Sequence, residues 1–291
     1  QHGSVYLKSC FGKKLASLDA SQDLKDQLAG CLTRTSSPIW MDSSTAEECA
    51  EIAETVGGND EVCRRSGSIM VERFTGSQIR KFFKTEPQAY AETEVIHLVS
   101  SFFAWIFAGK NVAIDHGDGA GMNLMNLASG EWDDALVSAT AEGLAEKLPS
   151  VALSATLSGS ISSYFVEKYG FSSECETVIW SGDNPCSLIG MGAAMPGKIV
   201  ISLGTSDTLF AAMSEAKTDP QGFGHAFGNP AGGYMSLICF KNGSLAREAV
   251  KNEFDLEWSA FEKEGLAETP IGNWGLMMLP FYEPEITPLL D

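Results

Sequence analysis

The sequence predicts an α/β protein with two domains. Three observations support this prediction. Strands and helices alternate between Thr177 and Met213, as in folds that pack helices against a sheet. The chain has 291 residues, which at about 150 residues per domain suggests two hydrophobic cores. Apolar residues make up 44% and charged residues 20% of the chain, a composition typical of globular rather than disordered proteins.

The elements before Thr177 are predicted from apolar spacing and boundary residues. Ser44 and Thr45 are suited to cap a helix in which Cys49, Ile52, Ala53 and Val56 recur at helical spacing, and Gly57-Gly58 is suited to end it. The other elements expected here, in chain order, are a strand at 2–7, helices at 77–83 and 93–107, a strand at 112–115 entering a glycine-rich turn at 117–121, and helices at 132–148 and 162–169.

The segment that follows has the strongest pattern. A buried strand is expected at 177–180, a turn at 181–185, a small-residue helix at 186–194, a strand at 198–203, a tight turn at 204–207 and a second strand at 208–213. Met195-Pro196-Gly197 interrupts this pattern and is the expected domain boundary, which divides the chain into 1–195 and 196–291.

Charge and composition exclude several classes of partner. The chain has 38 acidic and 20 basic residues, a formal charge of −18, which argues against nucleic acid or an anionic membrane as a main partner. The longest apolar run, 102–108, is well below the ~20 residues of a membrane span, and no secretory signal pattern opens the sequence. The seven cysteines are scattered without metal-ligand spacing, which favours reduced thiols in a cytoplasmic protein and no metal site.

Two familiar nucleotide-binding motifs are rejected. The glycines at 117–121 and 222–228 lack the G-x-G-x-x-G spacing of a dinucleotide-binding turn. The segment 192–198 has the glycines and lysine of a P-loop, but Ile199 stands where a Mg²⁺-binding hydroxyl is required, and the segment precedes a strand instead of following one.

Two turns are candidate ligand sites. The turn Gly204-Thr205-Ser206 can present backbone N–H groups and hydroxyls to an anion, although an ordinary hairpin with a polar turn has the same pattern. In the turn 181–185, Pro185 fits the first helical position, so Asn184 is expected as the N-cap and Asp183 beyond it, at the strand end where α/β proteins bind ligands. A capping role alone remains an alternative for both side chains.

Eight segments in the same order give the chain its resemblance to the FGGY carbohydrate kinases, and among them to the xylulokinases. They are QHG from Gln1, WMDSST from Trp40, ERFTGSQI from Glu72, DGAGMNL from Asp118, ISSYFVEKYGF from Ile161, SGDNPCSLIGM from Ser181, SLGTSDTLF from Ser202 and CFKNGSLARE from Cys239. Each segment alone is weak, but the ordered set covers nearly the whole chain.

The resemblance implies an actin-like ATPase (ribonuclease-H-like) fold, with two lobes around a cleft: a sugar-binding lobe at 1–195 and the start of an ATP-binding lobe at 196–291. It implies ATP-dependent phosphorylation of D-xylulose, with ATP and Mg²⁺ as cofactors. Asp183 resembles the family's general base, and His2, Arg73, Asp183 and Asn184 resemble its sugar contacts. Gly204, Thr205 and Ser206 resemble a phosphate-binding hairpin, and Trp258 a residue of the nucleotide pocket.

The chain also departs from the family pattern. The family's first phosphate hairpin, a D-x-G-T motif, and its Gly-Gly adenosine motif are absent, so both lobes are expected to be incomplete and no Mg²⁺ ligand is assigned. We therefore expect these residues to be the middle of a kinase, inactive alone and prone to aggregate at unpaired sheet edges. Two alternatives remain: a family member acting on another polyol or sugar acid, and a non-catalytic binding protein.

Overall fold

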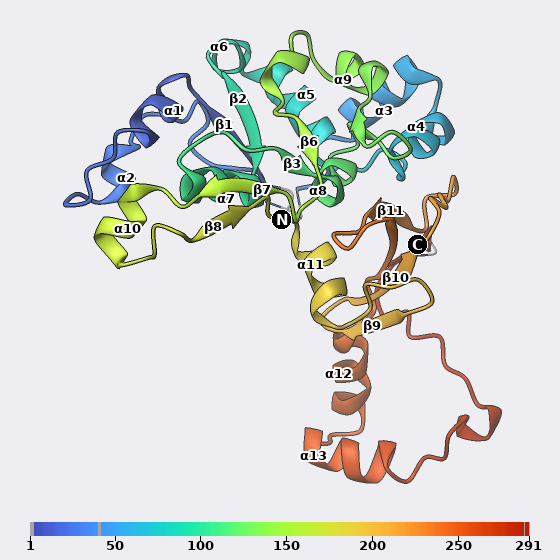
Figure 1. Ribbon diagram of the computed structural model, residues 1–291. Helices are drawn as coiled ribbons and strands as arrows, with labels where there is room; N and C mark the ends of the chain where they lie inside the picture. Colours follow the sequence, from blue (N-terminus) through green and yellow to red (C-terminus); the bar gives the residue numbers. More distant parts are fainter. Residues whose placement is uncertain (1–2, 40–41, 288, 291) are drawn as a thin grey trace.

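The computed structural model describes residues 3–39, 42–287 and 289–290. Figure 1 shows two α/β bodies connected through helix α11 (Asp183–Gly190). The larger body contains the elements before α11. The smaller is built on a four-stranded sheet, and α12 (Ser244–Glu253) and α13 (Trp258–Ala260) extend away from it. The predicted α/β class is confirmed.

The larger body contains short strands arranged in pairs. β1 (Ser4–Leu7) pairs antiparallel with β2 (Val95–Leu98), and β3 (Ile114–Asp115) runs parallel to β6 (Val151–Ala152). Two further antiparallel pairs are β4 (Met125–Asn126) with β5 (Glu131–Trp132) and β7 (Leu157–Ser160) with β8 (Glu176–Val178). The helices around them are α1 (Cys10–Leu15), α2 (Leu24–Gln27), α3 (Ala46–Val56), α4 (Asn59–Ser66), α5 (Thr75–Thr85), α6 (Pro87–Ala91), α7 (Val99–Ala108), α8 (His116–Gly121), α9 (Asp134–Thr140), a 3₁₀ turn (Ala145–Lys147) and α10 (Ser163–Tyr169).

The predicted helix at 93–107 is wrong in its first part. Val95–Leu98 forms strand β2, and the helix α7 begins only at Val99. Apolar spacing alone cannot distinguish a short buried strand from a helical turn. Pairing with β1, in which Val5 lies opposite His97, decides the conformation.

The other boundary errors have local causes. The helix expected at 132–148 is limited to α9 and a 3₁₀ turn, because Ala141 is extended and Gly143 has a left-handed φ of 69°. The strand expected at 177–180 is only half buried: Thr177 and Ile179 are buried, whereas Val178 and Trp180 are exposed, and β8 itself ends at Val178. Helix α3 ends at Gly57 as predicted, but the hydroxyl of Thr45 does not cap α3. It donates a hydrogen bond to Glu72 O and lies 3.0 Å from Ser77 Oγ.

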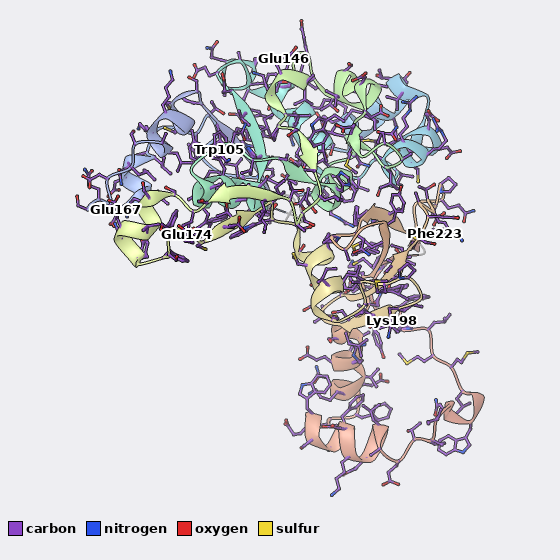
Figure 2. The ribbon with its side chains drawn as sticks, viewed as in Figure 1. Trp105, Glu146, Glu167, Glu174, Lys198 and Phe223 are labelled. Carbon is purple, nitrogen blue, oxygen red and sulfur yellow. The ribbon has the colours of Figure 1, made fainter. Side chains whose placement is uncertain are left out.

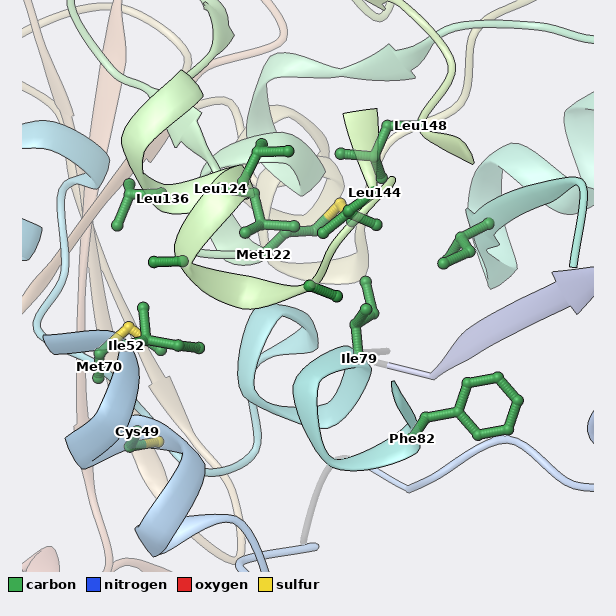
Figure 3. Packing of buried hydrophobic residues seen from close by; sticks show 14 of the residues in the cluster. Cys49, Ile52, Met70, Ile79, Phe82, Met122, Leu124, Leu136, Leu144 and Leu148 are labelled. Atoms are coloured by element: carbon green, nitrogen blue, oxygen red, sulfur yellow. The ribbon is translucent and has the colours of Figure 1, made fainter. Parts of the chain in front are cut away.

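Two hydrophobic clusters form the core of the larger body. Figure 3 shows the first, in which α3, α5 and the segment around α8 and α9 contribute Ile52, Ile79, Met122 and Leu136, each fully buried. The second lies between α1, α7 and α10; Trp105, labelled in Figure 2, is 5% exposed within it.

The smaller body is an antiparallel sheet in the order β11-β12-β10-β9. Its strands are β9 (Ile199–Leu203), β10 (Asp207–Met213), β11 (His225–Gly228) and β12 (Tyr234–Phe240). The predicted hairpin is confirmed, with Leu203 opposite Asp207. A third cluster contains Phe74 and Met125 from the larger body and Phe210 and Met235 from the sheet, so apolar packing connects the two bodies.

The C-terminal segment returns to this sheet. After a π-helical turn (Phe261–Leu266) and a 3₁₀ turn (Asn273–Gly275), β13 (Glu285–Ile286) pairs with β14 (Leu289–Leu290). The buried carboxylate of Glu285 accepts hydrogen bonds from the backbone N–H groups of Lys241 (2.6 Å) and Asn242 (3.1 Å), which holds β13 against the end of β12. None of the helices in the described ranges is long and apolar enough to cross a lipid bilayer.

Candidate active site

The site begins at the carboxyl end of β3. Asp115 is the N-cap of α8: its Oδ2 accepts a hydrogen bond from Gly117 N (3.1 Å) and its Oδ1 one from Asp118 N (2.8 Å). The sequence analysis expected a glycine-rich turn here, and the segment is instead a short helix. Glycine is a poor helix former, but in α8 it permits close approach: a Cβ on Gly117 would lie 2.8 Å from Pro185 Cγ.

Asp118, in the first turn of α8, is a buried carboxyl group with 8% of its surface exposed. Ser100 donates a hydrogen bond to its Oδ2. Burial, the charge of Asp115 and, more weakly, that of Asp183 together raise the pKa of Asp118 well above the ordinary range for a carboxyl group. Burial also raises the pKa of Asp115, against the hydrogen bonds that it accepts.

Helix α11 places the predicted general base beside these groups. It begins at Asp183 with Gly182 as the N-cap, so the expected N-cap at Asn184 is wrong. Gly182 has an extended conformation (φ −66°, ψ 165°), and Pro185 is tolerated at the third helical position because N–H groups of the first turn have no intrahelical partner. Asp183 is exposed, and its Oδ1 accepts a hydrogen bond from Asn184 N at 2.9 Å.

These groups line one pocket, which is open to solvent. Asp183 and Asn184 lie at its wall together with Asp118, and the other lining residues are Leu98, Gly117, Gly121, Gly182, Pro185 and Phe227. The pocket therefore combines apolar walls with carboxyl and amide groups, which suits a small ligand with several hydroxyls.

The predicted phosphate-binding turn lies between β9 and β10. Among the described residues, no hydrogen bond is formed by the backbone N–H groups of Gly204, Thr205 and Ser206 or by the hydroxyls of Thr205 and Ser206. Helix α12 holds the turn in place: Ser244 N donates a hydrogen bond to Gly204 O (2.7 Å), and Arg247 makes a bidentate ion pair with Asp207 (2.8 and 2.9 Å). Hydrogen-bond donors without partners on a turn held in this way are suited to bind an anionic group such as a phosphate.

The remaining predicted residues lie elsewhere or outside the described ranges. His2 is outside the described residues. Arg73 is half-buried in the turn before α5, and its charge acts on Cys239 of β12, but Arg73 does not line the pocket. Trp258 is 49% exposed at the start of α13, where its ring packs edge-on against Phe261 and Lys251 lies over it.

Asp118 is a pocket residue that was not predicted from the sequence, although it begins the segment DGAGMNL. Asp118 lies three positions after Asp115, which is the N-cap at the end of a strand. An acidic residue at that spacing is the sequence pattern from which a role for Asp118 could have been predicted. Within the described ranges, no cluster of three or more His, Cys, Asp or Glu side chains is arranged to hold a metal ion. No metal ligand is therefore assigned.

Comparisons with known proteins show the family to which the chain belongs. Residues 26–190 match the N-terminal domain of the FGGY family of carbohydrate kinases. The chain is 44% identical to xylulose kinase 2 of Arabidopsis thaliana, over 100% of this chain and 52% of that protein. It is 45% identical to the xylulose kinase of Rattus norvegicus, over 99% of this chain and 54% of the relative. The chain thus spans about half the length of the curated relatives it matches.

A solved structure supports the fold. The crystal structure of xylulose kinase from Bifidobacterium adolescentis superposes with a TM-score of 0.78 at 22% identity, covering 99% of this chain and 60% of that one. The fold is therefore the actin-like ATPase fold of the sugar kinases, as the sequence predicted. With the family match over more than half of its residues, the chain belongs to the FGGY family of carbohydrate kinases.

Proposed function

We propose that the protein containing this chain transfers the γ-phosphoryl group of ATP to D-xylulose, which gives D-xylulose 5-phosphate. The observation that carries the proposal is the pocket in which Asp183 and Asn184 begin a helix beside the buried Asp118. The names of the relatives support D-xylulose as the substrate, because they are called xylulose kinases.

Asp183 is the proposed general base. Its carboxylate is exposed at the pocket, so it can accept a proton from a sugar hydroxyl as that oxygen attacks phosphorus. Asn184, His2 and Arg73 are the proposed partners of the other sugar hydroxyls. Phosphoryl transfer passes through a loose transition state, so positioning the hydroxyl is the main task of these side chains.

The turn Gly204-Thr205-Ser206 is proposed to bind a phosphate of ATP through its free N–H and hydroxyl groups. Trp258 is proposed to line the nucleotide pocket. When bound, ATP supplies the phosphoryl group and Mg²⁺ offsets the negative charge on its oxygens. The residues of the turn would hold that phosphate while Asp183 orients the attacking hydroxyl.

We also propose that two parts of the chain bind different substrates. Residues 1–195 would form the sugar-binding part and 196–291 the beginning of the ATP-binding part. The family match at 26–190 supports the first of these assignments. The small-molecule substrates are the proposed partners. A cytoplasmic location is proposed because all seven cysteines are free thiols, which is usual in a reducing compartment.

A coupled ATP assay on the full-length protein, with a panel of ketoses, polyols and sugar acids, tests the proposal. We expect the highest kcat/KM with D-xylulose; a clear preference for another compound would contradict the substrate. Asp183→Asn should reduce kcat by at least about 100-fold and leave the Kd for the sugar nearly unchanged.

Asp134→Asn is the matched control for this substitution. Asp134 is also an exposed aspartate at the first position of a helix, α9, but lies outside the pocket, so this variant should keep wild-type kcat. Full activity in Asp183→Asn would show that another group is the base.

A further inference from the structure

Asp118 is a buried carboxyl group at the pocket wall that the proposed chemistry does not use. It lies on α8, opposite the helix that begins with Asp183 and Asn184, and only 8% of its surface is exposed. A carboxyl group is costly to bury unless its oxygens find partners. Capping does not explain its position, because Asp115 caps α8 and, in the described ranges, no backbone N–H group donates a hydrogen bond to the Asp118 carboxyl.

One oxygen of Asp118 is held in place by the protein and the other is available. Ser100 donates a hydrogen bond to Oδ2, which fixes the side chain, whereas no hydrogen bond to Oδ1 is found in the described part of the chain. Oδ1 lies only 2.5 Å from the place that a Cβ on residue 182 would occupy. Glycine at position 182 therefore leaves the room that this oxygen needs at the pocket wall.

The charges around Asp118 favour its neutral form. The groups that act on it include the carboxyls of Asp115, at the end of β3, and Asp183, at the start of α11. Burial and these like charges raise its pKa. A neutral carboxylic acid in such a setting can donate as well as accept a hydrogen bond, and so can a sugar hydroxyl.

We propose that Asp118 is a sugar-binding residue of this pocket, whose Oδ1 forms a hydrogen bond with a ketose hydroxyl other than the one that Asp183 deprotonates. The inference rests on the proposed sugar kinase function. It gives the pocket polar groups on two opposing elements, α8 and α11. A ligand held between them would be selected by the number and positions of its hydroxyls, because a site polar group left without a partner lowers affinity strongly.

The test is titration calorimetry of the full-length protein with D-xylulose, in the absence of ATP. Asp118→Ala should raise the Kd about tenfold or more, since one hydrogen bond to the sugar is lost. Asp118→Asn, which keeps a donor and an acceptor at nearly the same positions, should stay within about threefold of wild type. Equal Kd values for Asp118→Ala and wild type would overturn the proposal.

The control for a structural effect is Asp133→Ala. Asp133 is likewise buried and caps the helix α9, with Arg65 as its ion-pair partner, but it lies outside the pocket. This variant should lower the Tm while leaving the sugar Kd unchanged. If Asp118→Ala does not fold, Asp118→Ser, too short to reach the sugar, takes its place with the same expected rise in Kd.

Deoxy analogues of the ketose separate direct contact from indirect positioning. For the analogue that lacks the partner hydroxyl, the wild type and Asp118→Ala should bind equally weakly, whereas the other analogues should retain the difference between the two proteins. If none of the analogues removes that difference, Asp118 does not contact the sugar and the proposal is wrong.

Failure of the proposed kinase function can be distinguished from failure of the proposed role of Asp118. A wild type that binds D-xylulose but transfers no phosphate would contradict the kinase activity and leave the comparison of Kd values valid. A wild type that binds none of the ketoses tested would overturn both proposals.

Discussion

The hydroxyl of Ser181 donates a hydrogen bond of 2.7 Å to Oδ2 of Asp115. Asp115 ends a strand and caps α8, while Ser181 lies two residues before the helix that begins at Asp183. This single bond therefore connects the two helix starts that form the pocket. Its two partners, Asp115 and Ser181, are 66 residues apart in the sequence.

Ser181→Ala tests this connection. Loss of the hydrogen bond to Asp115 should lower the free energy of unfolding by about 1 kcal/mol, measured by urea denaturation. Ser187→Ala is the control, because the hydroxyl of Ser187, in α11, makes no hydrogen bond to any residue that the structure describes; its effect should stay below about 0.5 kcal/mol. Equal effects of the two substitutions would argue against a specific role for Ser181.

Gly228→Ala tests the contact between β11 and α8. A Cβ at this position would lie 2.5 Å from Cβ and 2.7 Å from the backbone carbon of His116, so the strand and the helix would have to separate. We expect a loss of about 1–3 kcal/mol in stability, typical of overpacking. In contrast, a Cβ on Gly190 would meet no atom within 4 Å, so Gly190→Ala should be neutral or slightly stabilising. Thermal unfolding of both variants would decide.

His97 predicts a pH dependence of stability. Its ring is fully buried, with Nδ1 2.9 Å from Ser101 Oγ and Nε2 2.8 Å from Asn111 Oδ1, and burial lowers its pKa from 6.5 to about 4. The folded protein therefore keeps this ring neutral down to about pH 4, whereas the unfolded chain takes up a proton below about pH 6.5. Stability should fall as the pH is lowered through this window, by about 2 kcal/mol between pH 7 and pH 5.

The measurement is the free energy of unfolding of wild type and His97→Gln between pH 7 and pH 5. The variant has no titrating ring at this position, so its stability should change less over this range. Parallel pH curves for the two proteins would show that His97 does not take up the proton.

The exposed apolar side chains of β9 lead us to expect that this 291-residue chain associates in solution. β9 is the edge strand of its sheet, and Ile199, Ile201 and Leu203 are each about two-thirds exposed. Exposed apolar edge strands promote association. Ile201→Thr should therefore reduce light scattering at a given concentration with little loss of stability, whereas Phe210→Ala, at a position only 3% exposed, should cost about 3–5 kcal/mol. Unchanged scattering in Ile201→Thr would contradict a role for this face.

Secondary-structure elements that are determined by residues close together in the sequence could be predicted. The helix α3 combines regular apolar spacing with a glycine that takes the left-handed conformation at its end, and the β9–β10 hairpin is defined by a turn of three small polar residues. The strand β2 was not predictable in this way. Its four residues are compatible with either conformation until β1 pairs with them.

Some residues of the candidate site could likewise be predicted from the sequence, and others could not. Asp183 and Asn184 could be proposed from the turn before α11 and from the order of the motifs, although their exact position in the helix could not. The sequence by itself thus determined the α/β class, the family resemblance and the candidate base, because these depend on local spacing and on residue identity. Only the tertiary structure decided that Asp118 faces the same pocket. Its burial, its bond to Ser100 and its approach to Gly182 join segments up to 82 residues apart (from Ser100 to Gly182), and proximity of that kind arises only when the chain has folded.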